Sequence, residues 1–380
     1  SVERRISKLI NEYEAQGFHR TGTAVDRVSG DWLSDQVGQA GLVPIQETFS
    51  LDRVDPISNV LVAGDRRIEG LPLFDGAFTG DDGVRGRLGT LESNAEIGLA
   101  RTAVNATATG ALGDARRNSR HQAIVAVTAG RRPGLCPSNA DSFLAPFGPP
   151  VLQVSSEEAA WLDEHAKRGA EVQLIAHVAR TSATAANVIA TIEGAAPEAP
   201  PLVIMTPRSG WYWCASERGG GIACWLEVMR ALRTSRPKRT VLFVASSGHE
   251  LGHLGINAFI DRRPGIVTKA VSWMHFGASI GAATDSRVTL QASDDELDAA
   301  LTRVLTSAGI GVDRRNPRGT IPGGEAEAVH REGGRYVSII GGNALFHNLD
   351  DRGPKAIDPS AIARFSTAFI ELARTLANAE

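Results

Sequence analysis

Short, strongly apolar runs alternate with helical patterns from residue 187 to residue 380, and this alternation limits the possible folds more than any other feature. The runs read as strands at 188–192, 202–205, 239–246 and 270–276, with helices at 221–234 and 250–260. Strands this apolar are typical of a parallel sheet that helices cover on both faces. We therefore predict an α/β domain with a central mixed, mostly parallel sheet flanked by helices.

The stretch between residues 59 and 186 has a different character. It is rich in Gly and Ala and carries short β-type runs, for example at 123–127 and 150–154. A chain of 380 residues also exceeds the usual size of one domain. We predict a β-rich inserted domain at 59–186, which interrupts a catalytic domain made of residues 1–58 and 187–380.

The overall charge argues against several classes of partner. The formal net charge is −3, so no global field favours nucleic acid or an anionic membrane. No apolar run is long enough to predict a membrane span. The three cysteines have no CxxC spacing, which favours a reducing compartment, and we expect a cytoplasmic protein. These features are compatible with a homo-oligomer.

Unusual polar and aromatic residues follow the predicted strands, where ligand sites of open α/β sheets lie. They are Arg208, Trp211, Tyr212, Trp213 and Glu217 after the strand at 202–205, His249 and Glu250 after the strand at 239–246, His275 in the strand at 270–276, and His347 before the last helix. Imidazoles and carboxylates gathered in this way predict a polar pocket that binds a metal or performs acid–base chemistry.

Several of these segments together resemble the M28 metallopeptidase family. The matching segments, in order, are Arg20–Thr23, Ala186–Gly194, Arg239–Ala245 followed by Glu250-Leu251-Gly252, and His347 with Asp350. The end of the insertion, Pro150–Val154, resembles a protease-associated (PA) domain. The resemblance implies a zinc-aminopeptidase-like fold with a PA-like insertion over nearly the whole chain.

The departures from the family pattern concern the metal site. Pro207 and Gly277 stand where the family has ligands of its first metal, and neither side chain can bind an ion. The resemblance places the second metal's ligands at Glu217, Glu250 and His347. It implies one zinc or other divalent metal, as in the similar glutaminyl cyclases, or none.

The resemblance also suggests roles for the remaining polar residues. His249 stands where the family has its general base, and imidazole accepts protons near neutral pH. His275 could partly replace the missing acid on the strand. Arg208 stands where an anion could be held. The successive rings of Trp211, Tyr212 and Trp213 cannot all face a core, so we predict that they form a substrate wall.

His249-Glu250-Leu251-Gly252-His253 also spells HExxH, the pattern of a helical zinc site. That site needs one helix through all five residues, whereas a predicted strand ends immediately before them. We therefore expect His253 to pack on a helix or to line the cleft.

Three functions are compatible with these residues. The first is an M28-like hydrolase that acts on an amide or related acyl bond of a small molecule or short peptide, with one metal or none. The second is a metal-free lyase or cyclising acyltransferase that uses His249, Glu250, His275 and His347. The third is an inactive binding module. The substituted residues remain chemically competent, which favours an enzyme, although not an ordinary two-zinc aminopeptidase.

Overall fold

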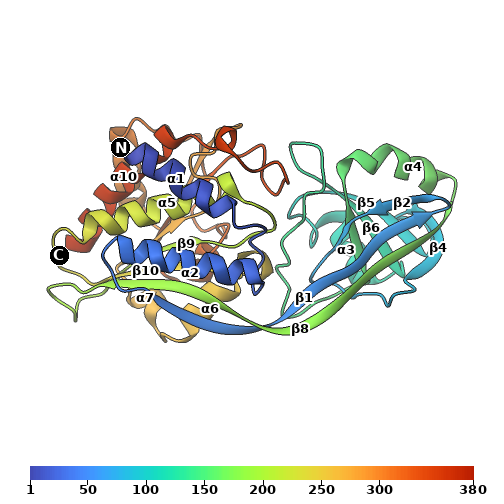
Figure 1. Ribbon diagram of the computed structural model, residues 1–380, viewed down its shortest axis with the longest axis horizontal. Helices are drawn as coiled ribbons and strands as arrows, with labels where there is room; N and C mark the ends of the chain where they lie inside the picture. Colours follow the sequence, from blue (N-terminus) through green and yellow to red (C-terminus); the bar gives the residue numbers. More distant parts are fainter.

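The computed structural model describes residues 1–380, which form two lobes joined by two long strands (Figure 1). The strands are β1 (Ile45–Ala63) and β8 (Glu171–Ile192), and they pair antiparallel over most of their length. One lobe carries both termini and most of the helices, whereas the other is built mainly from short strands. β1 and β8 belong to both lobes.

The larger lobe is built on a mixed sheet whose strand order is β13-β12-β14-β11-β9-β10-β8. Four central strands run parallel to one another, namely β10 (Val241–Ser246), β9 (Leu202–Pro207), β11 (Ser272–Phe276) and β14 (Tyr336–Gly341). β8 runs antiparallel to β10, and β12 (Val288–Ala292) runs antiparallel to β14, with β13 (Arg314–Arg315) at the edge. The predicted mixed, mostly parallel α/β sheet is confirmed.

Side chains of the central strands alternate between two hydrophobic cores, as a pleated sheet requires. In β9, Leu202 and Ile204 enter one core, while Val203 and Met205 enter the other. The first core is covered by α1 (Val2–Glu14), α2 (Ala24–Gln39), α5 (Ala215–Leu232), α8 (Asp295–Ser307) and α10 (Pro359–Asn378). The second is covered by α6 (Leu254–Asp261), α7 (Ile266–Lys269) and α9 (Ala326–Arg331). Both faces of the sheet are therefore buried (Figure 1).

The segment after β10 differs from the single helix predicted at 250–260. A 3₁₀ turn spans His249–Leu251, and α6 begins only at Leu254. Gly248, Gly252 and His253 have positive φ angles of 87°, 74° and 61°, which a continuous helix does not allow. The HExxH residues therefore do not lie on one helix.

The smaller lobe has its own hydrophobic core. Its strands are β2 (Arg66–Glu69), β3 (Leu71–Pro72), β4 (Val84–Thr90), β5 (Ile97–Ala103), β6 (Ala123–Ala129) and β7 (Val151–Val154), with helices α3 (Gly110–Asn118) and α4 (Ala159–Lys167). The predicted domain boundaries at 59 and 186 fall inside β1 and β8. The assignment of this lobe to the PA type stays a prediction.

All three cysteines are free and buried. None of the helices combines the length and the apolar character that crossing a bilayer requires.

Candidate active site

A pocket of about 650 Å³ lies where the two lobes meet. The larger lobe lines it with residues near the carboxyl ends of β10, β11 and β14, and the smaller lobe adds the loops after β5 and β6. Arg131 of the smaller lobe lines the pocket and forms an ion pair with Asp285 of the larger lobe. The pocket therefore lies at the edge of the sheet where α/β folds usually bind ligands.

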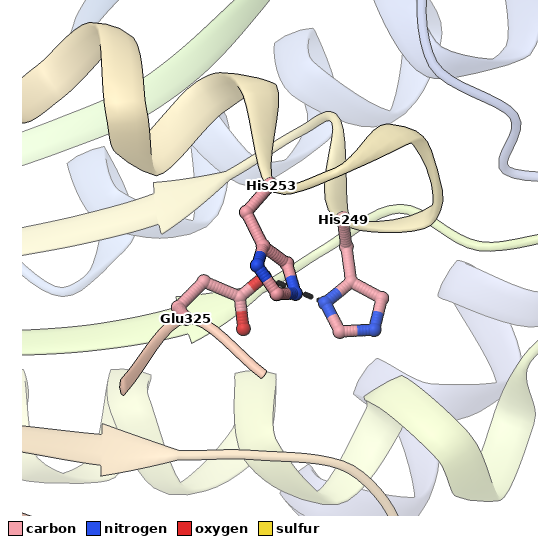
Figure 2. Close-up of side chains that lie close together, drawn as sticks. All are labelled: His249, His253 and Glu325. Carbon is pink, nitrogen blue, oxygen red and sulfur yellow. Dashed lines mark hydrogen bonds and ion pairs between the residues drawn. The ribbon is translucent and has the colours of Figure 1, made fainter. Parts of the chain in front are cut away.

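A line of hydrogen-bonded side chains borders the pocket. His249 Nδ1 lies 2.7 Å from Glu325 Oε1, and His275 Nε2 lies 3.1 Å from Glu325 Oε2. His275 Nδ1 is 2.8 Å from Ser338 Oγ. His253 lies beside His249, with ring centroids 5.2 Å apart (Figure 2). One carboxylate thus fixes two imidazoles that come from different strand ends.

Two glycines allow Glu325 to come this close to His249 and His275. Gly248 has a φ of 87°, and a Cβ atom there would lie 2.7 Å from Leu254 Cβ, so the chain turns sharply between β10 and His249. Gly324 has a φ of 66°, and a Cβ atom there would lie 2.8 Å from His275 Cε1. A side chain at either position would be strained and would crowd its neighbours. Both glycines therefore help to place Glu325 between the two imidazoles.

The charges of this group are set by burial and by neighbouring residues. Burial is the largest cause that lowers the pKa of His249, and the Arg218 guanidinium lowers it further. Burial alone would raise the pKa of Glu325, but the charge and hydrogen bond of His249 and the hydrogen bond of His275 outweigh it and hold that pKa well below its ordinary value. We therefore assign an ionised Glu325, to which ring nitrogens of His249 and His275 can each donate a hydrogen bond.

Glu217 and His347, two of the predicted metal ligands, lie together in a buried site. Glu217 Oε1 is 3.0 Å from His347 Nε2 and 3.1 Å from the Arg218 guanidinium. Burial alone would raise the pKa of Glu217, but Arg218 and His347 lower it below its ordinary range. Arg218 also donates to the carbonyl of Ser209 at 2.6 Å, which holds the guanidinium in place. A fixed cation thus lies against the carboxylate that the family resemblance assigned to a metal.

Glu250, the third predicted ligand, makes different contacts. Its Oε1 accepts a 2.8 Å hydrogen bond from the backbone N–H of Thr21, and burial raises its pKa. Glu250 does not line the pocket.

The predicted ligands fit a metal only in part. The atoms Glu217 Oε1, His347 Nε2 and Glu250 Oε2 are all buried without a hydrogen bond of good geometry, as unbound ligands would be. However, a different group brings three possible ligand atoms together. His249, His253 and Glu325 each have a ligand atom within 4.8 Å of those of the other two, and no other group of His, Cys, Asp or Glu side chains does so. Since Glu250 is not gathered with the others and Arg218 already supplies a positive charge, the family's metal set does not fit here.

The family resemblance itself is supported by direct comparison. A model of peptidase family M28 matches residues 187–373. These residues form an M28 peptidase domain. A probable zinc metalloprotease from Pyricularia oryzae is 32% identical over 135 residues, which cover 34% of this chain. That match spans only 25% of the length of the relative.

Solved structures show that the likeness in fold extends over both lobes. A zinc aminopeptidase from Bacillus subtilis superposes with a TM-score of 0.81 at 16% identity, over 99% of this chain and 94% of its own. An aminopeptidase from Aneurinibacillus sp. strain AM-1 has a TM-score of 0.76 at 13% identity, over 100% and 94% of the two chains. A glutaminyl cyclase from Porphyromonas gingivalis has a TM-score of 0.54 at 12% identity, over 97% and 96%.

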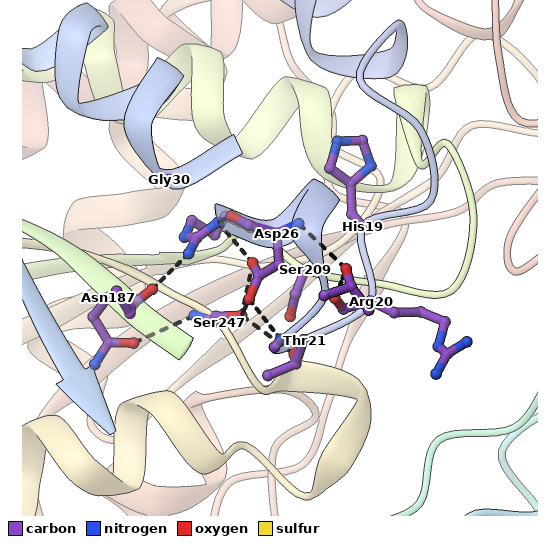
Figure 3. A network of polar contacts seen from close by, with 12 residues as sticks. His19, Arg20, Thr21, Asp26, Gly30, Asn187, Ser209 and Ser247 are labelled. Carbon is purple, nitrogen blue, oxygen red and sulfur yellow. Dashed lines mark hydrogen bonds and ion pairs between the residues drawn. The ribbon is translucent and has the colours of Figure 1, made fainter. Parts of the chain in front are cut away.

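Arg208, which we expected to hold an anion, is instead buried in the M28 domain. Its guanidinium lies 2.9 Å from Asp26 Oδ1 and donates to the carbonyl of Ala186 at 2.6 Å. Asp26 also accepts a hydrogen bond from Ser247 Oγ (Figure 3) and another from the backbone of Gly22. Arg208 therefore belongs to a buried network that joins α2 to β8 and to the end of β10. It does not line the pocket.

The three successive aromatic residues also lie outside the lining of the pocket. Trp211 is buried, packs edge-on against Phe74 and donates to Asn139 Oδ1 at 3.0 Å. The Tyr212 hydroxyl donates to the carbonyl of Leu135, and Trp213 packs against Phe18. Trp211 and Tyr212 thus connect the M28 domain to the smaller lobe. Among the predicted substrate-binding residues, only His275 lines the pocket.

The lining includes Glu325 and His253, which lie outside the predicted catalytic, substrate-binding and metal-ligating residues. The family resemblance places an acidic residue near the site at Glu325, and the HExxH spacing drew attention to His253. Asn105, Arg131, Asn139 and Asp141 come from the smaller lobe, and no motif marked them.

Replacement of Arg208 by Met should destabilise the fold. The change leaves Asp26 buried without its cation, and loss of one partner of a buried ion pair typically costs about 3–5 kcal/mol. Urea unfolding followed by circular dichroism measures the free energy of unfolding. Arg180→Met is the matched control, because Arg180 forms a more exposed ion pair with Asp52 and should lose less than about 1 kcal/mol. Equal losses in the two variants would contradict the role assigned to Arg208.

Proposed function

We propose that this protein hydrolyses an amide or related acyl bond of a small molecule or short peptide, with His249 as the general base. The observation that carries the proposal is the 2.7 Å contact between His249 Nδ1 and the Glu325 carboxylate at the wall of the pocket. A carboxylate that orients an imidazole is the usual way in which enzymes prepare a histidine base. The M28 fold and its hydrolase neighbours support the reaction class.

The contact with Glu325 assigns a role to each nitrogen of His249. Because Nδ1 faces the carboxylate, Nε2 is the atom left to accept a proton from water. The water oxygen then attacks the acyl carbon, and the imidazolium returns the proton to the leaving nitrogen or oxygen as the acyl bond breaks. Glu325 stabilises the imidazolium, while His275 and Ser338 keep the carboxylate oriented.

The volume of the pocket supports a small substrate. At about 650 Å³ it falls within the range usual for small-molecule sites. Amide side chains of Asn105 and Asn139 lie in its lining, and their Nδ2 groups can pair with the polar groups of an acyl substrate. No step of the reaction is assigned to a metal at Glu217, Glu250 and His347, because this set does not fit one.

Replacement of His249 by Ala should lower hydrolysis by about 10²–10⁴-fold, the usual contribution of a general base. The assay compares kcat and KM for p-nitrophenyl acetate, an acetylated amino-acid amide and an N-terminal glutaminyl peptide. We expect the loss to fall mainly on kcat. Glu325→Gln, which keeps the size of the side chain but removes its charge, should give a smaller loss in the same direction.

His165→Ala is the matched control, because His165 lies on α4 of the smaller lobe and stacks on Trp161. This variant should keep the activity of the unaltered protein. Full activity of His249→Ala would rule out the proposed base. Cyclisation of the glutaminyl peptide without hydrolysis would favour the acyltransferase hypothesis, and no turnover of any substrate would favour the binding module.

The pH dependence should reflect the buried position of His249. Its pKa is lowered from 6.5, first by burial and then by Arg218. A lowered pKa means that the imidazole stays unprotonated below pH 6.5, so kcat/KM should hold as the pH falls to 6.5 and decline only in more acidic solution. A pH–rate profile on p-nitrophenyl acetate tests this, and an acidic midpoint above pH 6.5 would contradict it.

Ordinary aminopeptidase substrates should be turned over slowly or not at all. Pro207 and Gly277 have no ligand atoms for the family's first metal, and Arg218 lies against Glu217. The measurement is release of p-nitroaniline from leucyl and alanyl p-nitroanilides, with and without added zinc chloride. Zinc-dependent turnover at rates typical of enzymes, about 1–10³ s⁻¹, would contradict this prediction.

A further inference from the structure

We propose that His249, His253 and Glu325 form a binding site for one zinc or similar transition-metal ion. This site shares no residue with the set that the M28 resemblance implies, which is Glu217, Glu250 and His347. Its three side chains come from the turn before α6 and from the loop before α9, and they meet at the wall of the pocket (Figure 2).

The spacing of the ligand atoms suits a single ion. One nitrogen of each imidazole and one oxygen of Glu325 all lie within 4.8 Å of one another. Around a tetrahedral zinc with bonds of about 2.0–2.2 Å, neighbouring ligand atoms are roughly 3.4 Å apart. Small rotations of the side chains are therefore enough to place all three around one ion.

The types of ligand determine which ion fits. Two imidazoles and one carboxylate match zinc and neighbouring transition metals, whereas magnesium and calcium prefer oxygen ligands. Three protein ligands also leave a fourth position open toward the pocket.

The residues around Glu325 also favour zinc binding. Its second oxygen lies 3.1 Å from His275 Nε2, and His275 is in turn held by Ser338. Hydrogen bonds of this kind orient ligand carboxylates and strengthen metal sites. A zinc ion can enter through the pocket without disturbing the buried contact between Arg218 and Glu217.

Binding at this site has a consequence that rests on the proposed function. The imidazole of His249 cannot act freely as a general base while it is a ligand, and a zinc ion also interrupts the contact between His249 and Glu325. Zinc should therefore inhibit the His249-dependent hydrolysis reversibly, and a chelator should restore it.

The test measures binding directly, without reference to turnover. The 380-residue chain is treated with EDTA, dialysed and titrated with zinc chloride in a calorimeter, and bound zinc is counted by mass spectrometry. We expect one zinc per chain. His253→Ala should weaken binding at least tenfold, while the control His165→Ala should bind as the unaltered protein does.

A second comparison separates this site from the family's position. Glu217→Gln should keep its zinc affinity, because Glu217 is not a ligand of the proposed site. Circular dichroism and thermal unfolding show whether each variant is folded. If His253→Ala does not fold, Glu325→Gln replaces it as the variant that lacks a ligand. The proposal is overturned if the unaltered protein binds no zinc, or if Glu217→Gln loses zinc while His253→Ala keeps it.

The two proposals can fail separately. If zinc binds as expected but increases hydrolysis, the metal site stands and the metal-free role of His249 is wrong. If zinc does not bind but His249→Ala still abolishes hydrolysis, the metal site is wrong and the general base stands.

Discussion

The arrangement of the pocket depends on one carboxylate that two imidazoles share. Glu325 is buried, and burial of an ionised carboxylate is unfavourable unless its oxygens are well paired. One oxygen is paired with His249 and the other with His275, so each of the three side chains fixes the other two. Removal of any one of them would leave polar groups of the other two without a hydrogen-bond partner. This mutual dependence holds together side chains that come from a turn, a strand and a loop.

A second buried charge lies at Glu217. Arg218 directly follows Glu217, and its guanidinium supplies a positive charge at the carboxylate that the family resemblance assigned to a metal. A guanidinium is always charged and has a fixed shape, so Arg218 can neutralise Glu217 without a metal ion. It also lowers the pKa of His249 and thereby favours the neutral form of that imidazole. The same residue thus affects both the buried Glu217–His347 pair and the wall of the pocket.

The smaller lobe completes the pocket, and the long antiparallel strands β1 and β8 hold it in position. Aromatic residues that follow β9 reinforce this connection, because Trp211 and Tyr212 donate hydrogen bonds to Asn139 and to the carbonyl of Leu135 in the smaller lobe. The ion pair between Arg131 and Asp285 links the lobes at the pocket itself. The shape of the pocket is therefore a property of both lobes.

The sequence by itself determined the α/β class, the order of the central elements and the strand ends at which polar residues gather. These features follow from local patterns, because apolar alternation and loop composition depend on near neighbours in the chain. It also placed His249 and His275 near the site, since both belong to predicted strand ends.

Only the tertiary structure decided which of these side chains contact one another. Arg208 and Arg218 look alike in the sequence, yet one pairs with Asp26 and the other with Glu217. Glu325 lies 76 residues from His249 along the chain, and no local pattern can specify a contact over that separation.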